Sequence, residues 1–508
     1  MRDQRGQITV FLSLAFLVFL GLVLCVLEGV HGYMESSLAE EAITETGDEI
    51  LANYDRYLFE KYHVFFLDPR EKDCITEEAG EFLNGYISSG FYGFRCLDLA
   101  VTDEKRAVDE KGLFLKYQIN EYMKYKRQVE VLKSLTRLIS DSKGWSQDLE
   151  DGKQDFNISE GDSSSSKKDS GDKKEEEEKV SEETIKYRQS WMKMKGTLEG
   201  ILHSGVLIYA ANDPGSLSSA SISKDDLPSQ GKAGGGKSSG MVSLPSFSFS
   251  KLAEWRSFLS TDHLAYPALA DSILDSRLPE YMTYYFSFYG GEESADETAL
   301  KYELEYIAGG KSSDLANLKY VVNRILLIRF ITNYAYASRD SSITSQAKLM
   351  AEAIAGYFGM PQAADAVKVL LVAALSYSES LLELHALLKG EKVALVKNSE
   401  NWNLSFVTCP VKLATKASIK EVNTGISYRD YLLFFCLMNS ETSILYRMMD
   451  IMQLNARLHE PGFRMEDCLF SFKWKVRLAC PKWFVNIPGI GKGGGQYYEL
   501  ETDRYVSY

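Results

Sequence analysis

The sequence ITVFLSLAFLVFLGLVLCVL, residues 8–27, organises the rest of the chain around it. It contains no charged residue in 20 positions. At about 1.5 Å per residue, a helix of this length spans about 30 Å, the hydrocarbon thickness of a bilayer. Arg2 and Arg5 precede the stretch and Glu28 follows it. The positive-inside rule therefore predicts a single-pass protein of the cell membrane, with residues 1–7 in the cytoplasm and the C-terminal body extracytoplasmic.

Two alternatives compete with a retained membrane helix. A cleaved secretory signal also starts with basic residues, but its apolar core is usually about 7–15 residues long and ends at a small-residue cleavage site. The sequence EGVHG, which follows the stretch, is a poor site of that kind. A core helix would normally carry a polar face, which residues 8–27 lack. Length and flanking charge favour the membrane helix.

The residues at the junction with this helix carry a family resemblance. Residues 5–11, RGQITVF, resemble the start of TadE/TadG-like proteins of tight-adherence (Flp) pilus assembly, in which a basic stub ends in Gly and a short small or apolar run leads into the membrane helix. TadE and Flp pilin members have Glu where Phe11 stands here, so the resemblance is nearer to TadG-like members. It implies pilus or secretion-system subunits as partners. It also marks Gly6 and Gln7 as a candidate processing junction.

A second resemblance lies within the body. Residues 305–314, EYIAGGKSSD, resemble a segment of an uncharacterised family of membrane-anchored proteins from Gram-positive bacteria, which implies no known chemistry.

Composition limits the partners and the chemistry. The net charge of −14 argues against a nucleic-acid surface. Seven cysteines include Cys25 in the apolar stretch and six outside it, with no CxxC pair and no Cys/His cluster of metal spacing. Disulfides remain open for the outer six, and buried free thiols are the favoured interpretation.

Hydrophobic periodicity predicts a mainly helical α+β fold with a membrane helix and stalk, a helical ectodomain, a small antiparallel sheet and a projecting helical hairpin. A charged, low-complexity stretch with almost no large apolar residues marks the hairpin tip as disordered. The predicted parts are a cytoplasmic stub (1–7), the membrane helix (8–27), the stalk and first part of the ectodomain (28–102), the hairpin (103–211, tip 147–182), a Gly/Ser-rich linker (212–248) and the body (249–508).

The sheet is predicted from residues 468–480, where apolar and polar residues alternate over thirteen positions. Residues 402–408 alternate in the same way and are the expected partner strand. The polar face carries Lys473, Lys475 and Arg477. These cations either protect an exposed edge strand from aggregation or form a surface that docks an acidic partner or a cell-wall polymer.

No motif in the chain predicts a catalytic, cofactor-binding or metal site. Residues 231–238, GKAGGGKS, match the phosphate-binding P-loop pattern, but no buried strand precedes them and no helical pattern follows. Residues 309–313 predict a turn into a helix capped by Asp314, with a weak anion site as the alternative. Glu303 and Glu305 fit a solvated edge, and each of the six histidines fits a surface or packing role.

Three functions fit these features. The favoured one is a non-enzymatic, membrane-anchored component of a Tad/Flp-type pilus or envelope-assembly system that acts through protein–protein contacts. The alternatives are a membrane-tethered envelope hydrolase, which would need a cleft with convergent acids or a metal, and a surface binding module that reaches out with the hairpin.

Overall fold

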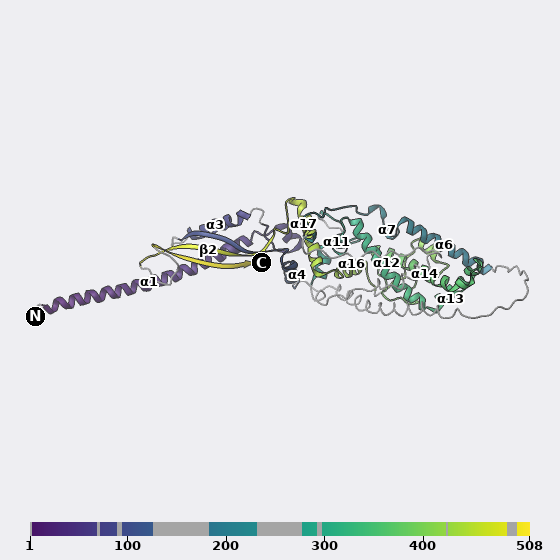
Figure 1. Ribbon diagram of the computed structural model, residues 1–508, viewed down its shortest axis with the longest axis horizontal. Coiled ribbons are helices and arrows are strands. Elements are labelled where there is room, and N and C mark those ends of the chain that lie inside the picture. The colour runs from purple at the N-terminus through teal and green to yellow at the C-terminus, as the bar shows by residue number, and fades with distance from the viewer. Residues whose placement is uncertain are drawn as a thin grey trace, which may run out of the picture. The chain divides into compact units, whose positions relative to one another are not determined.

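The computed structural model describes residues 3–68, 72–88, 94–124, 182–230, 277–291, 297–422, 425–484 and 495–508 of the chain. These residues belong to two compact units. Unit 1 contains Met1–Tyr122 and Met452–Tyr508, and unit 2 contains Met123–Ile451. The fold is mainly helical with a small antiparallel sheet, as predicted (Figure 1).

Unit 1 begins with the long helix α1, Asp3–Leu51. Its first half is the apolar stretch, and large side chains there such as Phe11 and Val18 are 72% and 70% exposed. This helix is long and apolar enough to cross a membrane. The helix continues past the apolar stretch and ends at Leu51. The role of this continuation as a stalk stays a prediction. The Asp55 carboxylate then accepts a hydrogen bond from the Leu58 amide and caps α2, Arg56–Tyr62.

The sheet of unit 1 has the strand order β1-β2-β3, with both pairs antiparallel. The strands are β1 Arg95–Arg106, β2 Leu469–Pro481 and β3 Tyr497–Ser507. The alternation predicted for residues 468–480 is confirmed by β2. The predicted pairing with residues 402–408 is wrong, since β2 pairs with β1 and β3. The edge-strand interpretation is also wrong, because β2 is the central strand.

Helices α1 and α3, Lys72–Ser88, pack on the sheet and enclose the core of unit 1. Phe472, Trp474 and Val476 of β2 point into this core. Gly47 of α1 marks a close approach, since a Cβ there would lie 2.8 Å from a methyl group of Val506. The absence of a side chain at Gly47 therefore sets how near the helix comes to β3. Unit 1 also contains η1 Asp109–Gly112 and α4 Leu113–Met123, whose last residue lies at the boundary of unit 2.

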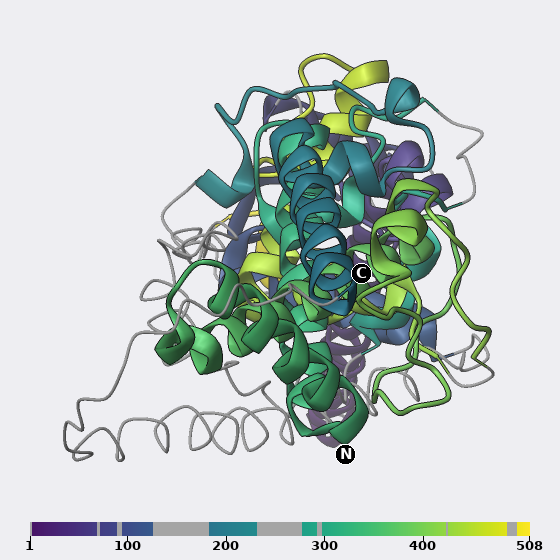
Figure 2. The ribbon, with the colours of Figure 1, turned by 90° about the vertical axis from the view of Figure 1, so that its right-hand side faces the viewer.

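Unit 2 is a helical bundle around α14, Ala364–Leu388, whose side chains are buried almost all round from Val367 onward. Helices α7, α12, α13 and α15 contact it, and α6 packs against α13 and α15 (Figure 2). The other elements are α6 Glu182–Ser204, α7 Val206–Ala210, η3 Pro214–Ser216, η4 Pro228–Gln230, α10 Leu278–Tyr285, α11 Glu303–Gly309, α12 Asp314–Arg339, α13 Ser341–Tyr357, η7 Pro361–Ala363, α15 Cys409–Ala414, α16 Tyr428–Leu437 and the start of α17 Glu441–His459.

The predicted hairpin differs from the structure at its beginning. Asp103–Arg106 form the end of β1, so the first helix of that region starts only at Leu113. The two predicted arms belong mainly to different units, and α6 is packed within unit 2. Residues 125–181, which include the predicted tip, lie outside the described residues. The tip therefore stays a prediction.

Candidate functional site

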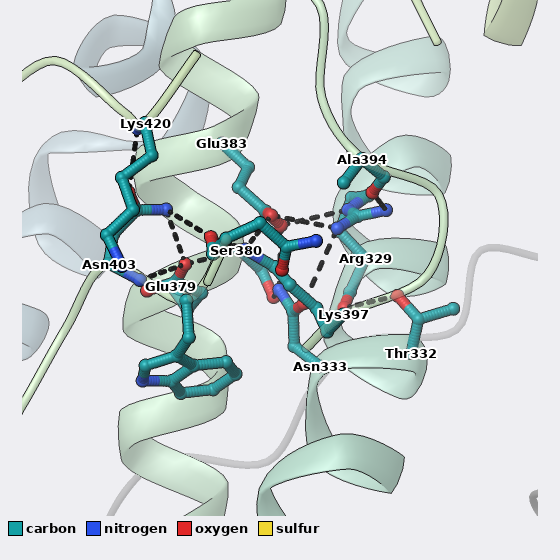
Figure 3. Close-up of polar contacts among 12 residues, drawn as sticks. Arg329, Thr332, Asn333, Glu379, Ser380, Glu383, Ala394, Lys397, Asn403 and Lys420 are labelled. Atoms are coloured by element: carbon teal, nitrogen blue, oxygen red, sulfur yellow. Dashed lines mark hydrogen bonds and ion pairs between the residues drawn. The ribbon is translucent and has the colours of Figure 1, made fainter. Parts of the chain in front are cut away.

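The most concentrated group of charged side chains lies in the interior of unit 2, between α12, α14 and the segment that follows α14 (Figure 3). Helical spacing places Arg329 and Asn333 on one face of α12, and Glu379 and Glu383 on one face of α14, because residues four apart are neighbours on a helix. Lys397 enters from the following segment. We call these five residues the buried ionic network.

Glu383 is the centre of the network. Its Oε2 accepts from Arg329 Nε at 2.9 Å and from Asn333 Nδ2 at 2.7 Å. Its Oε1 accepts from Arg329 Nη2 at 2.8 Å and lies 2.6 Å from Lys397 Nζ. Lys397 Nζ also donates to Glu379 Oε1 at 2.7 Å. Two cations thus face two carboxylates, and the network has no net charge when all four are ionised.

Electrostatics keep the central pair charged despite complete burial. Burial disfavours the ionised carboxyl of Glu383, but Arg329 and then Lys397 outweigh burial and hold the pKa of Glu383 below its ordinary value. Burial also disfavours the guanidinium of Arg329, and Glu383 more than offsets this, so the pKa of Arg329 lies above its usual range. Arg329 and Glu383 are both 0% exposed, so solvent does not reach this pair.

The network also explains why residues 402–408 form no strand. Glu379 accepts hydrogen bonds from the backbone amides of Asn403 at 3.0 Å and Leu404 at 3.0 Å. Trp402 folds back and donates from Nε1 to the Leu404 carbonyl. These backbone groups are therefore satisfied by a buried carboxylate and a local side chain, and the alternating pattern reflects burial of Trp402, Leu404 and Phe406 in a loop.

A second set of buried carboxylates in unit 2 holds loops in place. Glu303 and Glu305 are 1% and 0% exposed, so the prediction of a solvated edge is wrong. Glu305 accepts from the Tyr289 amide at 2.9 Å and from the Tyr428 hydroxyl at 2.7 Å. Burial raises the pKa of Glu305 to about 7, and the hydrogen bond from Tyr428 limits the rise.

The turn into α12 has the predicted form with a different cap. Gly310 adopts φ 59° at the end of α11. The N-cap of α12 is Ser313, whose hydroxyl accepts from the Ala316 amide. Asp314 turns away from the helix and accepts from the Lys301 and Tyr302 amides at 2.9 and 3.1 Å. The prediction of Asp314 as the cap is therefore wrong by one residue.

A third charged group lies in unit 1, just beyond the apolar stretch of α1. Glu28, His31 and Glu35 share one face of the helix and are 0%, 3% and 1% exposed. His31 Nε2 lies 3.2 Å from Glu35 Oε1. Burial, and then the charge of Glu28, raise the pKa of Glu35 to about 8, while burial lowers the pKa of His31 and Glu28 opposes that shift. At pH 7, Glu35 is therefore mostly protonated beside a neutral imidazole.

The predicted basic face of β2 has acidic neighbours on both adjacent strands. Lys475 Nζ lies 3.0 Å from Glu501, Arg477 lies 3.0 Å from Asp98, and Lys473 forms an ion pair with Asp503. Arg477 lies directly across from Asp98, while Lys473 and Lys475 reach acids that are diagonal neighbours on β3. Cross-strand pairing thus accounts for the three cations, since opposite charges on neighbouring strands stabilise a sheet. Their role as a partner surface stays a prediction.

Three carboxylates of unit 1 could hold a metal ion. Ligand oxygens of Asp55, Asp68 and Glu460 lie within 4.8 Å of one another, and all three side chains are half-buried. Carboxylates suit a hard cation such as Ca²⁺. The three positions are distant in sequence and follow no ligand spacing, so sequence reasoning had no signal for them.

The candidate processing junction, Gly6 and Gln7, lies within the continuous helix α1. The P-loop match at residues 231–238 lies outside the described residues. Cys409, Cys436, Cys468 and Cys480 are buried free thiols, as favoured from the sequence.

Comparison with known proteins identifies the family of most of the chain. Residues 175–480 match a family of unknown function, DUF5702. The chain belongs to this family. The DUF5702 match covers the described helices of unit 2, together with β2 of unit 1. No curated protein and no solved structure matches the chain.

Proposed function

We propose that this DUF5702 protein is a non-enzymatic, membrane-anchored component of an envelope-assembly apparatus of the Tad/Flp pilus type. In this proposal α1 crosses the cell membrane and the N-terminus is cytoplasmic. Unit 2 and the part of unit 1 that follows the apolar stretch lie on the extracytoplasmic side. The helix packs beside other subunits and the body makes protein–protein contacts.

The observation that carries the proposal is the continuity of α1. An exposed apolar stretch suited to lipid and a stalk segment that forms part of the core of unit 1 belong to one uninterrupted helix, Asp3–Leu51. Because the helix is continuous, the part of unit 1 that packs on it is held in a fixed position relative to the membrane segment. That property suits a structural subunit, and the RGQITVF start adds the resemblance to pilus-assembly proteins.

The charged clusters of unit 2 support a structural role. The Arg329–Glu383 pair is fully buried, and Glu303, Glu305 and Asp314 use their oxygens to hold backbone amides of neighbouring loops. Groups engaged in this way stabilise one arrangement of the chain. A general acid or base would instead need access to a substrate.

The test is affinity purification of the tagged full chain from cross-linked membranes of its native host. A matched control replaces residues 8–27 with an unrelated apolar membrane helix of the same length. We expect the native chain to retain pilus or secretion-system subunits that the control recovers less well. Recovery of no such subunit, or degradation of cell-wall polymer by the purified chain, would reject the proposal in favour of a binding module or a hydrolase.

A further inference from the structure

The end of strand β2 is attached to α1 where the apolar stretch ends. Glu28 directly follows that stretch, and its carboxylate accepts hydrogen bonds from the backbone amides of Trp483 at 3.1 Å and Phe484 at 2.6 Å. Both aromatic residues follow β2 closely in sequence and belong to unit 1 with α1. The contact therefore fixes two aromatic residues at the level where α1 changes from apolar to polar.

The aromatic side chains remain open to the outside although their backbone is held. The ring of Trp483 stacks on His31 with the centroids 3.8 Å apart, yet Trp483 is 50% exposed and Phe484 is 52% exposed. The stack covers the buried face of α1 that carries Glu28 and His31. The outer sides of both aromatic rings form an exposed apolar surface.

The opposite face of α1 is also apolar and exposed at this level. Helical spacing places Val26, Val30 and Tyr33 together on that face, and they are 57%, 53% and 77% exposed. Exposed apolar surface therefore continues past Glu28 on both α1 and the segment that follows β2. A soluble surface seldom keeps such side chains together without a partner.

The height of these residues agrees with a position in the bilayer interface. If residues 8–27 fill the hydrocarbon core, Glu28 and His31 lie within about 6 Å of its edge, from the rise of a helix. The headgroup region extends about 5–8 Å beyond each side of the hydrocarbon. Trp is enriched at this depth because its ring is apolar while its N–H remains polar.

We propose that Trp483 and Phe484 insert into the headgroup region of the bilayer that α1 crosses, as a second membrane contact of unit 1. The occupant of this surface is lipid, since the surface continues the lipid-facing helix. Glu28 fits this setting, because the two amide donors satisfy a carboxylate that would otherwise face a poorly hydrated zone. With α1 and this aromatic pair both in contact with lipid, unit 1 would resist rotation and tilt in the membrane more than it would with α1 alone. The inference rests on the proposed membrane anchoring.

The test uses the full chain reconstituted alone into phosphatidylcholine vesicles that carry bromine atoms on the acyl chains, either near the headgroup or near the bilayer centre. Flotation with the vesicles after alkaline carbonate treatment reports anchoring. Quenching of tryptophan fluorescence by the bromolipids reports contact with lipid. Trp483→Phe removes the proposed probe, and Trp402→Phe, in the buried loop of unit 2, is the matched control.

We expect shallow bromolipids to quench the native chain more than deep ones. Trp483→Phe should lose most of that quenching, and Trp402→Phe should keep it. Equal quenching in the native chain and Trp483→Phe, with both chains floating, would overturn this inference and leave the anchoring intact. Quenching of Trp483 by aqueous iodide but not by bromolipid would overturn it in favour of a protein partner. Failure of the native chain to float would overturn the anchoring and this inference together.

Discussion

Arg329 binds both carboxylate oxygens of Glu383 in the interior of unit 2, with Nε 2.9 Å from Oε2 and Nη2 2.8 Å from Oε1. The pair joins α12 to α14, which are separated in the sequence by α13 and contact each other extensively. A buried pair of this kind contributes little over an apolar pair, but loss of one partner leaves an uncompensated charge. Stability of the bundle therefore depends on keeping the pair complete.

Arg329→Met should lower the free energy of unfolding of unit 2 by about 3–5 kcal/mol. The carboxylate of Glu383 would stay buried without the guanidinium that balances its charge. Urea unfolding of the full chain in detergent, followed by circular dichroism, measures this change. Lys319→Met is the control, since this substitution of an exposed residue of the same helix should cost less than about 0.5 kcal/mol. Equal effects of the two variants would show that the network does not stabilise the bundle.

The double variant Arg329→Met/Glu383→Leu should be less destabilised than the sum of the two single variants. Removal of both partners leaves only Lys397 and Glu379, which still pair with each other. A double-mutant cycle gives the coupling free energy, and we expect it to exceed about 1 kcal/mol for groups in direct contact. An additive result would contradict the direct coupling of Arg329 and Glu383.

The stability of unit 2 should fall as pH rises from about 4.5 to about 7, through Glu305. Its pKa in the folded chain is about 7, above the ordinary value of 4.5, so the folded state binds more protons than the unfolded state in this window. Glu305→Gln should flatten this part of the stability profile. Tyr428→Phe should extend the fall to higher pH, because the hydrogen bond from Tyr428 lowers the pKa. An unchanged profile in both variants would refute the assignment.

Glu28 should protect the amides of Trp483 and Phe484 from hydrogen exchange. Hydrogen bonds to a charged group contribute about 1.5–3 kcal/mol, so Glu28→Ala should speed exchange at both amides by roughly 10- to 100-fold. Residue-resolved hydrogen exchange measures this effect. The Lys482 amide, which donates to Gln496, is the internal control and should not change. Equal acceleration at all three amides would indicate general loosening of the segment after β2 and would contradict the specific role of Glu28.

The cations on β2 should contribute through cross-strand pairing. Lys475→Glu places an acid directly across from Asp503 and diagonal to Glu501. It should cost less than about 1 kcal/mol, because the pair with Glu501 is well exposed. The charge swap Lys475→Glu/Glu501→Lys restores the diagonal pair and should recover part of that loss in urea unfolding, because position 475 still faces Asp503 and position 501 still faces Arg477. Retention of subunits in the affinity purification described above is measured separately for the same variants. If the swap restores stability but not binding, the basic face itself is the docking surface.

The parts that follow from local pattern were predictable. The uncharged stretch predicted the exposed half of α1, hydrophobic periodicity predicted a helical body, and strict alternation predicted β2. The strand β1 gave no such signal. It contains the charged sequence TDEKR and irregular register near Thr102 and Lys105, so its burial pattern does not alternate. Its partner β2 lies more than 360 residues away in sequence, beyond the reach of pattern reasoning.

The buried charged groups could not be predicted for a different reason. A carboxylate such as Glu305 or Glu379 is buried because distant amides and hydroxyls satisfy it, and those donors come together only in the folded chain. The spacing of apolar residues in the sequence does not indicate where such donors will lie. The same limit applied to Glu28, which the sequence presents only as the charge that ends the membrane stretch, while the structure joins it to Trp483.

The most direct test of the account is the topology of the full chain in the native membrane. The chain carries one epitope at each terminus, and protease is added to intact cells from which the wall has been removed. We predict that the C-terminal epitope disappears, while the N-terminal epitope survives in a fragment that alkaline carbonate does not extract. A C-terminal epitope that persists until the cells are lysed, or a chain that carbonate releases, would contradict the account.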